Sequence, residues 1–319
     1  MKIDISFDGL PKEEKLEIAK EVVNSNDLAV RRIIEESRSK SMILNSKAEG
    51  NPVDEMEKYL QEVLKLLSDR VLIEYLENHE IIPQPVLEKI LVGRNGNVII
   101  WAINSKLYGE HFRKQYYKSA EEKIRIAIVE CEDTDENMLI EMAKYDKSSK
   151  VRCALASVSY ESVLIILCND CSSEQEKRIL AENPNTPEEF LKNWAKDGGA
   201  AIWRALLKNK NIPQKAISYI YYKTSSSYIL EDCINNPNCS SEVLCKYITK
   251  NRYVLLKYSD RVLGHPNASA EVVESFANAC IKEYKKSVRN DKDIYLRLLR
   301  KAYMHKNASD ELKKKIDEI

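Results

Sequence analysis

The sequence predicts an all-α fold made of stacked helix–turn–helix repeats, and three observations predict it. The 319 residues include only 8 Gly and 9 Pro, a composition that favours helices over turn-rich β architecture. A short turn recurs along the chain, as "ENPNT" at 182–186, "NNPNC" at 235–239, "GHPNA" at 264–268 and "MHKNA" at 304–308. Apolar residues on both sides of this turn have helical spacing.

The recurrence has a regular period. With Asn185 as the central residue of its turn, equivalent residues fall every 26 positions from Ile81 to Asn211. The next ones are Asn238, Asn267 and Asn307, at steps of 27, 29 and 40 residues. Fixed self-similarity of this kind is typical of repeat architectures. The sequence therefore predicts an α-solenoid over 69–319, with repeats of about 26 residues that become longer and irregular after 230.

Each repeat is expected to hold two helices. Apolar residues five, six and nine positions after the central residue, such as Phe190, Leu191 and Trp194, form one stripe of a second helix. Segments upstream of the turn, such as "AAIWRALL" at 200–207, predict the first helix. Thr186 is expected to cap the second helix and to form a capping box with Glu189, while Pro187 and Pro213 suit a first helical turn.

Residues 1–68 do not follow the repeat register. Segments such as "PKEEKLEIAKEVV" and "VDEMEKYLQEVLKLL" still indicate helices there. Because a stack of repeats exposes core at its first unit, we expect 1–68 to form an N-terminal helical cap.

The run "KVRCALASVSYESVLIIL" at 150–167, with "EKRILAENPNTPEEFLKNWAKD" at 176–197, resembles leucine-rich repeat variant proteins. A general HEAT-like helical solenoid is the alternative, because the period here is slightly longer than that of the family. The resemblance implies a right-handed superhelix and no shared activity. Some family members carry an N-terminal cysteine cluster with an iron–sulfur centre. The first cysteine here is Cys131, inside the repeats, so the resemblance implies no such centre.

Composition excludes several classes of function. The 50 basic and 50 acidic residues cancel, which disfavours a dedicated nucleic-acid binder. The N-terminus lacks the pattern of a signal peptide, and no apolar run reaches the length of a membrane span. Eight dispersed cysteines are typical of a reduced protein. We therefore expect a cytoplasmic protein with no membrane association.

No catalytic, cofactor-binding or metal-binding constellation stands out. His79, His265 and His305 each lie two residues before a central residue, which indicates turn residues and not catalytic bases. Cys168 and Cys171 form a lone C-x-x-C that lacks the further ligands of a zinc site, so buried packing is the expected role. We predict no cofactor and no enzymatic activity.

Arginines recur seven residues before three consecutive central residues, at Arg152, Arg178 and Arg204. We expect them to form a structural ladder with the acidic residues of the turns between repeats, Asp146, Asp170 and Asp197. The alternative is a row of donors for carboxylates or phosphates of a partner, and Arg204, beside Trp203, is expected to serve both purposes.

Other residues indicate a surface for a partner. Exposed tyrosines with lysines are typical of protein interfaces, and the basic stretch at 282–301 is the most positive part of the chain. The candidates are Trp203, Arg204, Tyr221, Tyr222, Tyr228, Lys285, Lys286 and Arg289.

The sequence thus predicts a non-enzymatic scaffold that binds a protein partner of unknown identity. The alternative is a nucleic-acid-binding repeat protein that resembles the HEAT-like DNA alkylation-repair glycosylases. In that alternative Trp101, Trp203, Arg204 and the region of Asp197 would imitate the glycosylase site.

Overall fold

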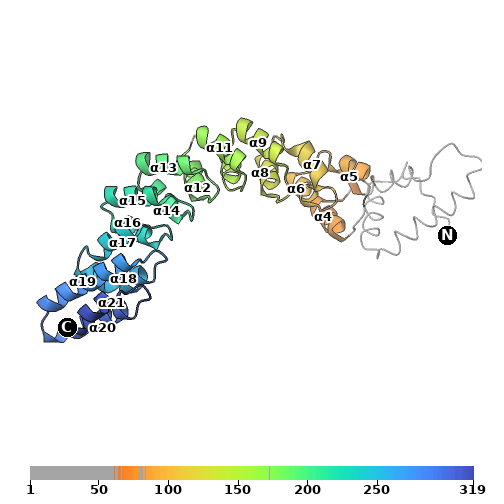
Figure 1. Ribbon diagram of the computed structural model, residues 1–319. Helices are drawn as coiled ribbons and strands as arrows, with labels where there is room; N and C mark the ends of the chain where they lie inside the picture. The colour runs from red at the N-terminus through yellow and green to blue at the C-terminus, as the bar shows by residue number, and fades with distance from the viewer. Residues whose placement is uncertain (1–60, 62–63, 66, 79–81, 83, 172) are drawn as a thin grey trace, which may run out of the picture. The chain divides into compact units, whose positions relative to one another are not determined.

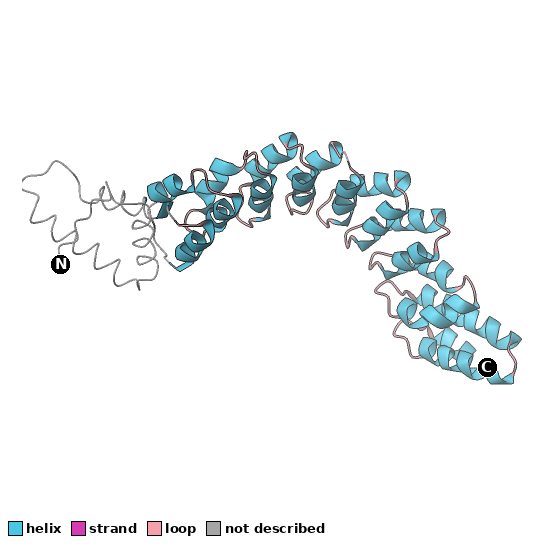
Figure 2. Cartoon of the chain, turned by 180° about the vertical axis from the view of Figure 1, so that it is seen from behind, coloured by secondary structure: helices cyan, strands magenta, loops and turns pink. Residues whose placement is uncertain are grey.

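The computed structural model describes residues 61–319 apart from 62–63, 66, 79–81, 83 and 172 (Figure 1). In this described part of the chain every regular element is a helix, and none is a strand (Figure 2). The predicted all-α class is therefore confirmed. The cap predicted for 1–68 lies almost entirely outside the described residues, and so does His79.

The chain divides into two compact units, Met1–Met138 and Leu139–Ile319. The helices described wholly within the first unit are α4 (Asp69–Asn78), α5 (Gln84–Leu91), α6 (Gly96–Asn104), α7 (Gly109–Tyr116) and α8 (Glu122–Glu130). Helix α9 (Glu136–Tyr145) contains the division. The second unit holds α10 (Ser149–Leu155), α11 (Glu161–Asn169), α12 (Glu174–Glu182), α13 (Glu188–Asp197), α14 (Ala200–Lys208), α15 (Gln214–Lys223), α16 (Ser227–Asn235), α17 (Ser241–Ile248), α18 (Arg252–Leu263), α19 (Ala270–Lys286), α20 (Arg289–Tyr303) and α21 (Asp310–Asp317).

Within each unit, helices of the same type pack on one another. In the first unit α4 contacts α6 and α6 contacts α8. In the second unit α10, α12, α14 and α16 follow one another as the first-helix layer, while α13 contacts α15 and α17 contacts α19 in the second-helix layer. This packing is that of a helical repeat solenoid, as predicted.

The layers give each unit two edges. The helices of one layer run in the same direction, so the turns inside the repeats gather at one edge, which we call the central-turn edge. The turns that join consecutive repeats gather at the other, which we call the inter-repeat edge.

The predicted apolar columns form the core between the layers. In α15 the residues five, six and nine positions after Asn211 (Ala216, Ile217 and Ile220) are all buried. In α13 Leu191 and Trp194 are buried and Phe190 is half-buried. Full burial of a large apolar side chain contributes about 1.5–3 kcal/mol to stability. The residues of this column therefore hold each second helix against the first-helix layer.

The hydroxyl of Thr186 has a different role from the one predicted. Its Oγ1 donates to the carbonyl of Leu180 at 2.5 Å, and Thr134 does the same to Ile128 at 2.5 Å. The cap position of α13 is Pro187, which has no side-chain cap. The expected capping box with Glu189 is therefore wrong, because Thr186 closes the helix that ends and not the one that begins.

In later repeats a serine one position further along caps the second helix. Ser240 accepts from the N–H of Val243, and Ser309 accepts from that of Leu312. A hydroxyl group thus closes the first helix in the turn of Thr186 and caps the second helix in the turns of Ser240 and Ser309.

A ladder of asparagines joins the central turns of the second unit. The Nδ2 group of Asn209 donates to the carbonyls of Ala181 (3.0 Å) and Asn183 (2.7 Å) in the preceding turn. Its Oδ1 accepts the N–H of Asn211 at 2.8 Å. Asn183 and Asn236 repeat this arrangement, each with two carbonyls of the turn before it. Each of these asparagines, which we call a rung, therefore hydrogen-bonds to three backbone groups and joins two successive turns.

Histidines occupy the same position in the last two turns. Nδ1 of His265 accepts the N–H of Asn267 at 3.0 Å, so Nε2 carries the proton and donates to the carbonyl of Asn236 at 2.9 Å. His305 likewise accepts from Asn307 and donates to Leu263 at 2.9 Å. The interpretation of His265 and His305 as turn residues is confirmed.

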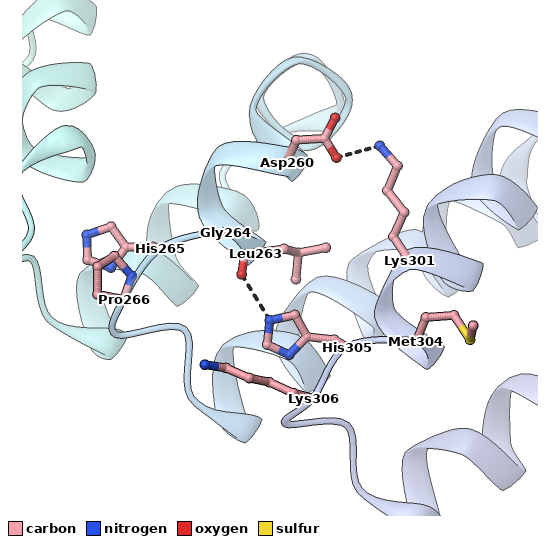
Figure 3. Close-up of a pocket in the computed structure, with 9 residues that line it drawn as sticks. All are labelled: Asp260, Leu263, Gly264, His265, Pro266, Lys301, Met304, His305 and Lys306. Atoms are coloured by element: carbon pink, nitrogen blue, oxygen red, sulfur yellow. Dashed lines mark hydrogen bonds and ion pairs between the residues drawn. The ribbon is translucent and has the colours of Figure 1, made fainter.

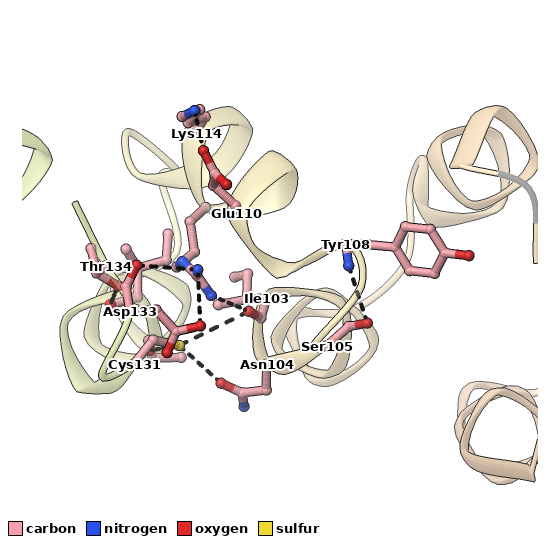
Figure 4. A network of polar contacts seen from close by, with 12 residues as sticks. Ile103, Asn104, Ser105, Tyr108, Glu110, Lys114, Cys131, Asp133 and Thr134 are labelled. Carbon is pink, nitrogen blue, oxygen red and sulfur yellow. Dashed lines mark hydrogen bonds and ion pairs between the residues drawn. The ribbon is translucent and has the colours of Figure 1, made fainter. Parts of the chain in front are cut away.

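Arginines hold the earlier repeats together. Arg94 donates to the carbonyls of Leu64 (2.9 Å) and Leu67 (2.7 Å) and pairs with Asp69 at 2.9 Å. Arg113 donates to the carbonyls of Ile103 (3.1 Å) and Asp133 (3.3 Å). Figure 4 shows the network around these two carbonyls.

Candidate functional site

Arg152 is a buried structural residue. Its guanidinium pairs with the carboxylate of Glu176 at 2.9 Å, and Glu176 is only 1% exposed. It also donates to the carbonyls of Ala143 (3.2 Å) and Asp170 (2.8 Å) and lies 3.5 Å from the Asp170 carboxylate. A structural role was predicted for Arg152, but Glu176 is the main partner.

Arg178 and Arg204 do not continue this arrangement. Arg178 is exposed on α12 and makes no hydrogen bond or ion pair within the described residues. Arg204 is 60% exposed and pairs with Asp232 at 3.1 Å, not with Asp197. The predicted ladder is therefore wrong for both.

The other two acidic residues of the predicted ladder, Asp146 and Asp197, differ in their contacts. Asp146 accepts a hydrogen bond from the N–H of Ser148 at 2.9 Å. Asp197 is exposed and has no polar partner among the described residues.

A one-residue shift in helix register explains the failure. The core positions Val151 and Leu155 of α10 are followed 25 residues later by Glu176 and Leu180, both buried. Counting by 26 therefore misaligned Arg152 with Arg178 and Arg204. The true equivalents face the core side, whereas Arg178 and Arg204 face solvent.

Trp203 is one of these equivalents. It is half-buried, and its indole N–H donates to the carbonyl of Ala195 at 2.9 Å, as Arg152 donates to Ala143. Trp203 therefore packs within its repeat, and Arg204 pairs with Asp232 and not with Asp197. Trp101 belongs to the other unit.

Cys168 is buried, and Cys153 and Cys171 are partly buried. Burial raises the pKa of Cys168 to about 12 and also raises those of Cys153 and Cys171. Nucleophiles and metal ligands are thiolates, so these surroundings favour packing. In the described part of the chain no three His, Cys, Asp or Glu side chains gather as a metal-binding group would.

Two grooves cross the surface of the second unit. One, of about 640 Å³, lies beside Arg178 between α12 and α14, where Lys208 pairs with Glu182 at 2.8 Å. The other, of about 620 Å³, lies at the central-turn edge between α18 and α20 (Figure 3). There Lys301 pairs with Asp260, and His305 is held by the Leu263 carbonyl. In both grooves much of the polar lining is already paired.

The exposed aromatic residues gather at the inter-repeat edge of the second unit. Within the described residues the large aromatic side chains that are exposed are all tyrosines, and each starts from the last two or first two residues of a helix at this edge. They are Tyr145 (74% exposed), Tyr222 (50%), Tyr228 (75%) and Tyr253 (63%). We call these four residues the tyrosine edge.

Tyr222 is held in place by contacts with its neighbours. Its hydroxyl donates to the carboxylate of Glu242 at 2.8 Å, and the ammonium of Lys246 lies 4.4 Å from its ring centroid and contacts its hydroxyl. Tyr221 packs against Tyr222. Its side chain is half-buried, and the two ring centroids lie 5.4 Å apart in an edge-to-face arrangement. Burial raises the pKa of Tyr221 to about 12. Of the two, Tyr222 is therefore the one that a partner can reach.

Tyr145 and Tyr253 were missed by sequence reasoning. Tyr228 and Tyr253 are both the second residue of a first helix, in consecutive repeats, and this shared position is the signal that identifies Tyr253. The ammonium of Lys257 lies 5.2 Å from its ring.

The basic candidates lie at the same edge. Lys285 is exposed without a polar partner in the described residues, and Lys286 pairs with Glu283 at 3.2 Å. The side chain of Arg289 lies outside what the structure describes.

None of the described helices combines the length and the apolar character needed to cross a membrane. Comparison with protein-family models, with curated proteins and with solved structures gives no match to this chain. The resemblance to leucine-rich repeat variant proteins therefore remains a prediction from the sequence.

Proposed function

We propose that this protein is a non-enzymatic scaffold that binds a protein partner along the tyrosine edge. The observation that carries the proposal is the gathering of Tyr145, Tyr222, Tyr228 and Tyr253 at one edge of a repeat stack.

Tyrosine suits such a surface for physical reasons. Its ring offers a large apolar area and its hydroxyl a hydrogen bond, while only two side-chain torsions are frozen on binding. Tyrosine is accordingly enriched among the residues that carry binding energy. Repetition across consecutive repeats would let an elongated partner contact several rings at once.

A cytoplasmic location is part of the proposal. All eight cysteines are free thiols, the state that a reducing compartment maintains. Buried thiols at Cys168 and Cys280 serve packing in such a protein.

The test places a photo-crosslinking amino acid at Tyr228 in cells. Cross-linked proteins would be identified by mass spectrometry and compared with those from the same probe at Met304, which is 75% exposed at the central-turn edge. We expect one protein to be captured from position 228 and not from 304.

The captured protein would then be purified and its affinity measured. We expect Tyr228→Ser with Tyr253→Ser to weaken binding at least tenfold, because hot-spot residues each contribute about 2 kcal/mol or more. Met304→Ser is the matched control and should bind like the wild type. Equal affinity of the tyrosine variant and the control would refute the proposal.

A further inference from the structure

We propose that the partner presents an acidic peptide segment, which lies across the last three inter-repeat turns of the second unit. This inference rests on the proposed function and specifies the chemistry of what the tyrosine edge binds. It follows from an uneven distribution of charge that the neutral total conceals.

The last three inter-repeat turns together carry a strong positive charge, most of it in 246–257 and 282–293. Residues 219–228, 246–257 and 282–293 contain ten Lys or Arg and three acidic residues, a net formal charge of +7. The three preceding inter-repeat turns, 142–151, 166–177 and 192–203, contain six basic and five acidic residues, a net charge of +1.

The opposite edge of the same repeats has no positive excess. The central turns 234–243, 263–272 and 303–312 contain one basic and four acidic residues, and one of these, Glu242, bonds to Tyr222 and Lys246. The positive charge of the C-terminal repeats therefore lies on the edge that carries Tyr222, Tyr228 and Tyr253. Such a field attracts a partner of negative charge.

Several of these cations are available to a partner. Lys250 and Lys285 are exposed and have no polar partner within the described residues, and Lys223 contacts only the ring of Tyr219, at 5.7 Å. Each of the three turns supplies one of them. Hydrogen bonds to tyrosine hydroxyls raise the pKa values of Lys246 and Lys257, which keeps both ammonium groups charged.

The geometry favours an acidic peptide over a nucleic acid. Bases bind by stacking on aromatic faces, but Lys246 covers the ring of Tyr222 at 4.4 Å and Lys257 covers that of Tyr253 at 5.2 Å. Carboxylate side chains instead reach the ammonium groups singly, while the ring of Tyr228, 75% exposed, stays available to the rest of the peptide.

The spacing sets the length of the segment. Packed helices lie about 8–10 Å apart, so three consecutive turns span roughly 20 Å or somewhat more. An extended chain covers about 3.3 Å per residue, so about eight residues suffice.

The experiment measures binding of a fluorescein-labelled peptide of six Glu-Ser repeats to the full-length chain by fluorescence polarisation. The comparison probes are six Gln-Ser repeats and a twelve-nucleotide oligothymidylate. We expect the Glu-Ser peptide to bind, the Gln-Ser peptide to bind at least tenfold more weakly, and the affinity for Glu-Ser to fall as salt screens the charges.

Two matched variants locate the site. The first is a triple variant that changes one lysine in each inter-repeat turn and combines Lys223→Glu, Lys250→Glu and Lys285→Glu. The second is a triple variant that makes the same change in charge at exposed positions of the central-turn edge and combines Lys210→Glu, Lys215→Glu and Lys306→Glu. We expect the first variant to lose at least tenfold in affinity for the Glu-Ser peptide and the second to change it less than twofold, with unchanged circular dichroism for both.

Equal losses in the two variants would overturn the proposal, because attraction would then depend on total charge alone. Tighter binding of the oligothymidylate than of the Glu-Ser peptide, lost in the first variant, would overturn it in favour of a nucleic acid. If the peptide fails to bind while a partner is captured at Tyr228, the acidic chemistry is wrong and the scaffold proposal stands. If both fail, both are wrong.

Discussion

The earlier repeats and the later repeats solve the same packing problem with different side chains. Between residues 64 and 176, long arginines with acidic partners hold backbone carbonyls, as Arg94, Arg113 and Arg152 do. Between residues 156 and 307, short asparagines and histidines form the rungs, as Asn209 and His265 do. The two kinds of contact overlap around residues 156–176, where the rung of Asn183 reaches back to Ala156 and Val158.

The difference follows from the lengths of the two kinds of side chain. An asparagine amide can bridge two carbonyls of the preceding turn only where successive turns stack in nearly constant geometry, as they do around Asn209 and Asn236. Arginine has a longer stem and five donors, so it tolerates irregular stacking. Its charge then requires an acidic partner, and Asp69 and Glu176 provide one.

The largest expected effect comes from breaking an arginine contact. Arg152→Ala leaves the buried Glu176 carboxylate without its partner and should destabilise the protein by about 3–5 kcal/mol. Arg178→Ala is the matched control on the neighbouring first helix, and an exposed, unpaired arginine should cost less than about 0.5 kcal/mol. Urea unfolding measures both, and superimposable curves for the two variants would contradict the comparison.

Removing a rung should have a smaller effect. Asn209→Ala strands the N–H of Asn211 and removes both donors to the preceding turn, for an expected loss of about 1–3 kcal/mol. Asn235→Ala, at an exposed helix end, serves as control and should be neutral. A rung variant as stable as this control would mean that the ladder adds nothing to stacking.

Alkaline pH should weaken the later repeats. Burial raises the pKa values of Cys239 and Cys280 to about 12, whereas an exposed thiol titrates near 8.5. Above that pH the unfolded chain binds fewer protons than the folded one, so stability falls as pH rises. From pH 7 to pH 9 each thiol should cost about 0.5–1 kcal/mol.

Urea unfolding at pH 7 and pH 9 measures this loss of stability. The double variant that combines Cys239→Ala with Cys280→Ala should lose less stability over this pH range than the wild type. An unchanged pH dependence in that variant would show that other groups are responsible.

The smallest effect is expected for exchanging one rung type for the other. In His265→Asn, Oδ1 replaces Nδ1 as acceptor for Asn267 and Nδ2 replaces Nε2 as donor to Asn236. The change in melting temperature should correspond to less than about 0.5 kcal/mol, whereas His265→Ala should resemble Asn209→Ala. Equal melting temperatures for His265→Asn and His265→Ala would show that the two rung types are not equivalent.

Local, periodic features were predictable from the sequence. The helix pairs, the buried columns and the turn role of His265 follow from patterns within a single repeat. The Arg152 contacts were mispredicted in part because α10 is displaced by one residue in register, which no fixed count reveals. The rungs could not be predicted, since each joins turns about 26 residues apart and depends on how repeats stack.

The same limit applies to the surface. Tyr221 and Tyr222 are neighbours on one helix, and successive residues point about 100° apart, so only one of them faces solvent. The sequence does not say which. The segregation of charge needed the edges to be defined first, because each basic turn alone resembles an ordinary solvated stretch.

The contacts of His305 have a consequence for engineering. Although 40 residues separate Asn267 from Asn307, His305 still reaches the carbonyl of Leu263 at 2.9 Å, and Asn307 that of Ala268 at 2.6 Å. The additional residues lengthen α19 and α20, which meet at Ser287 on the inter-repeat edge. Sequence can therefore be inserted at that edge while the hydrogen bonds of the other are retained. A grafted loop would fit after Ser287, where the fold has already absorbed a long insertion, whereas the same graft at Lys210 would separate Asn209 from Asn211 within one rung.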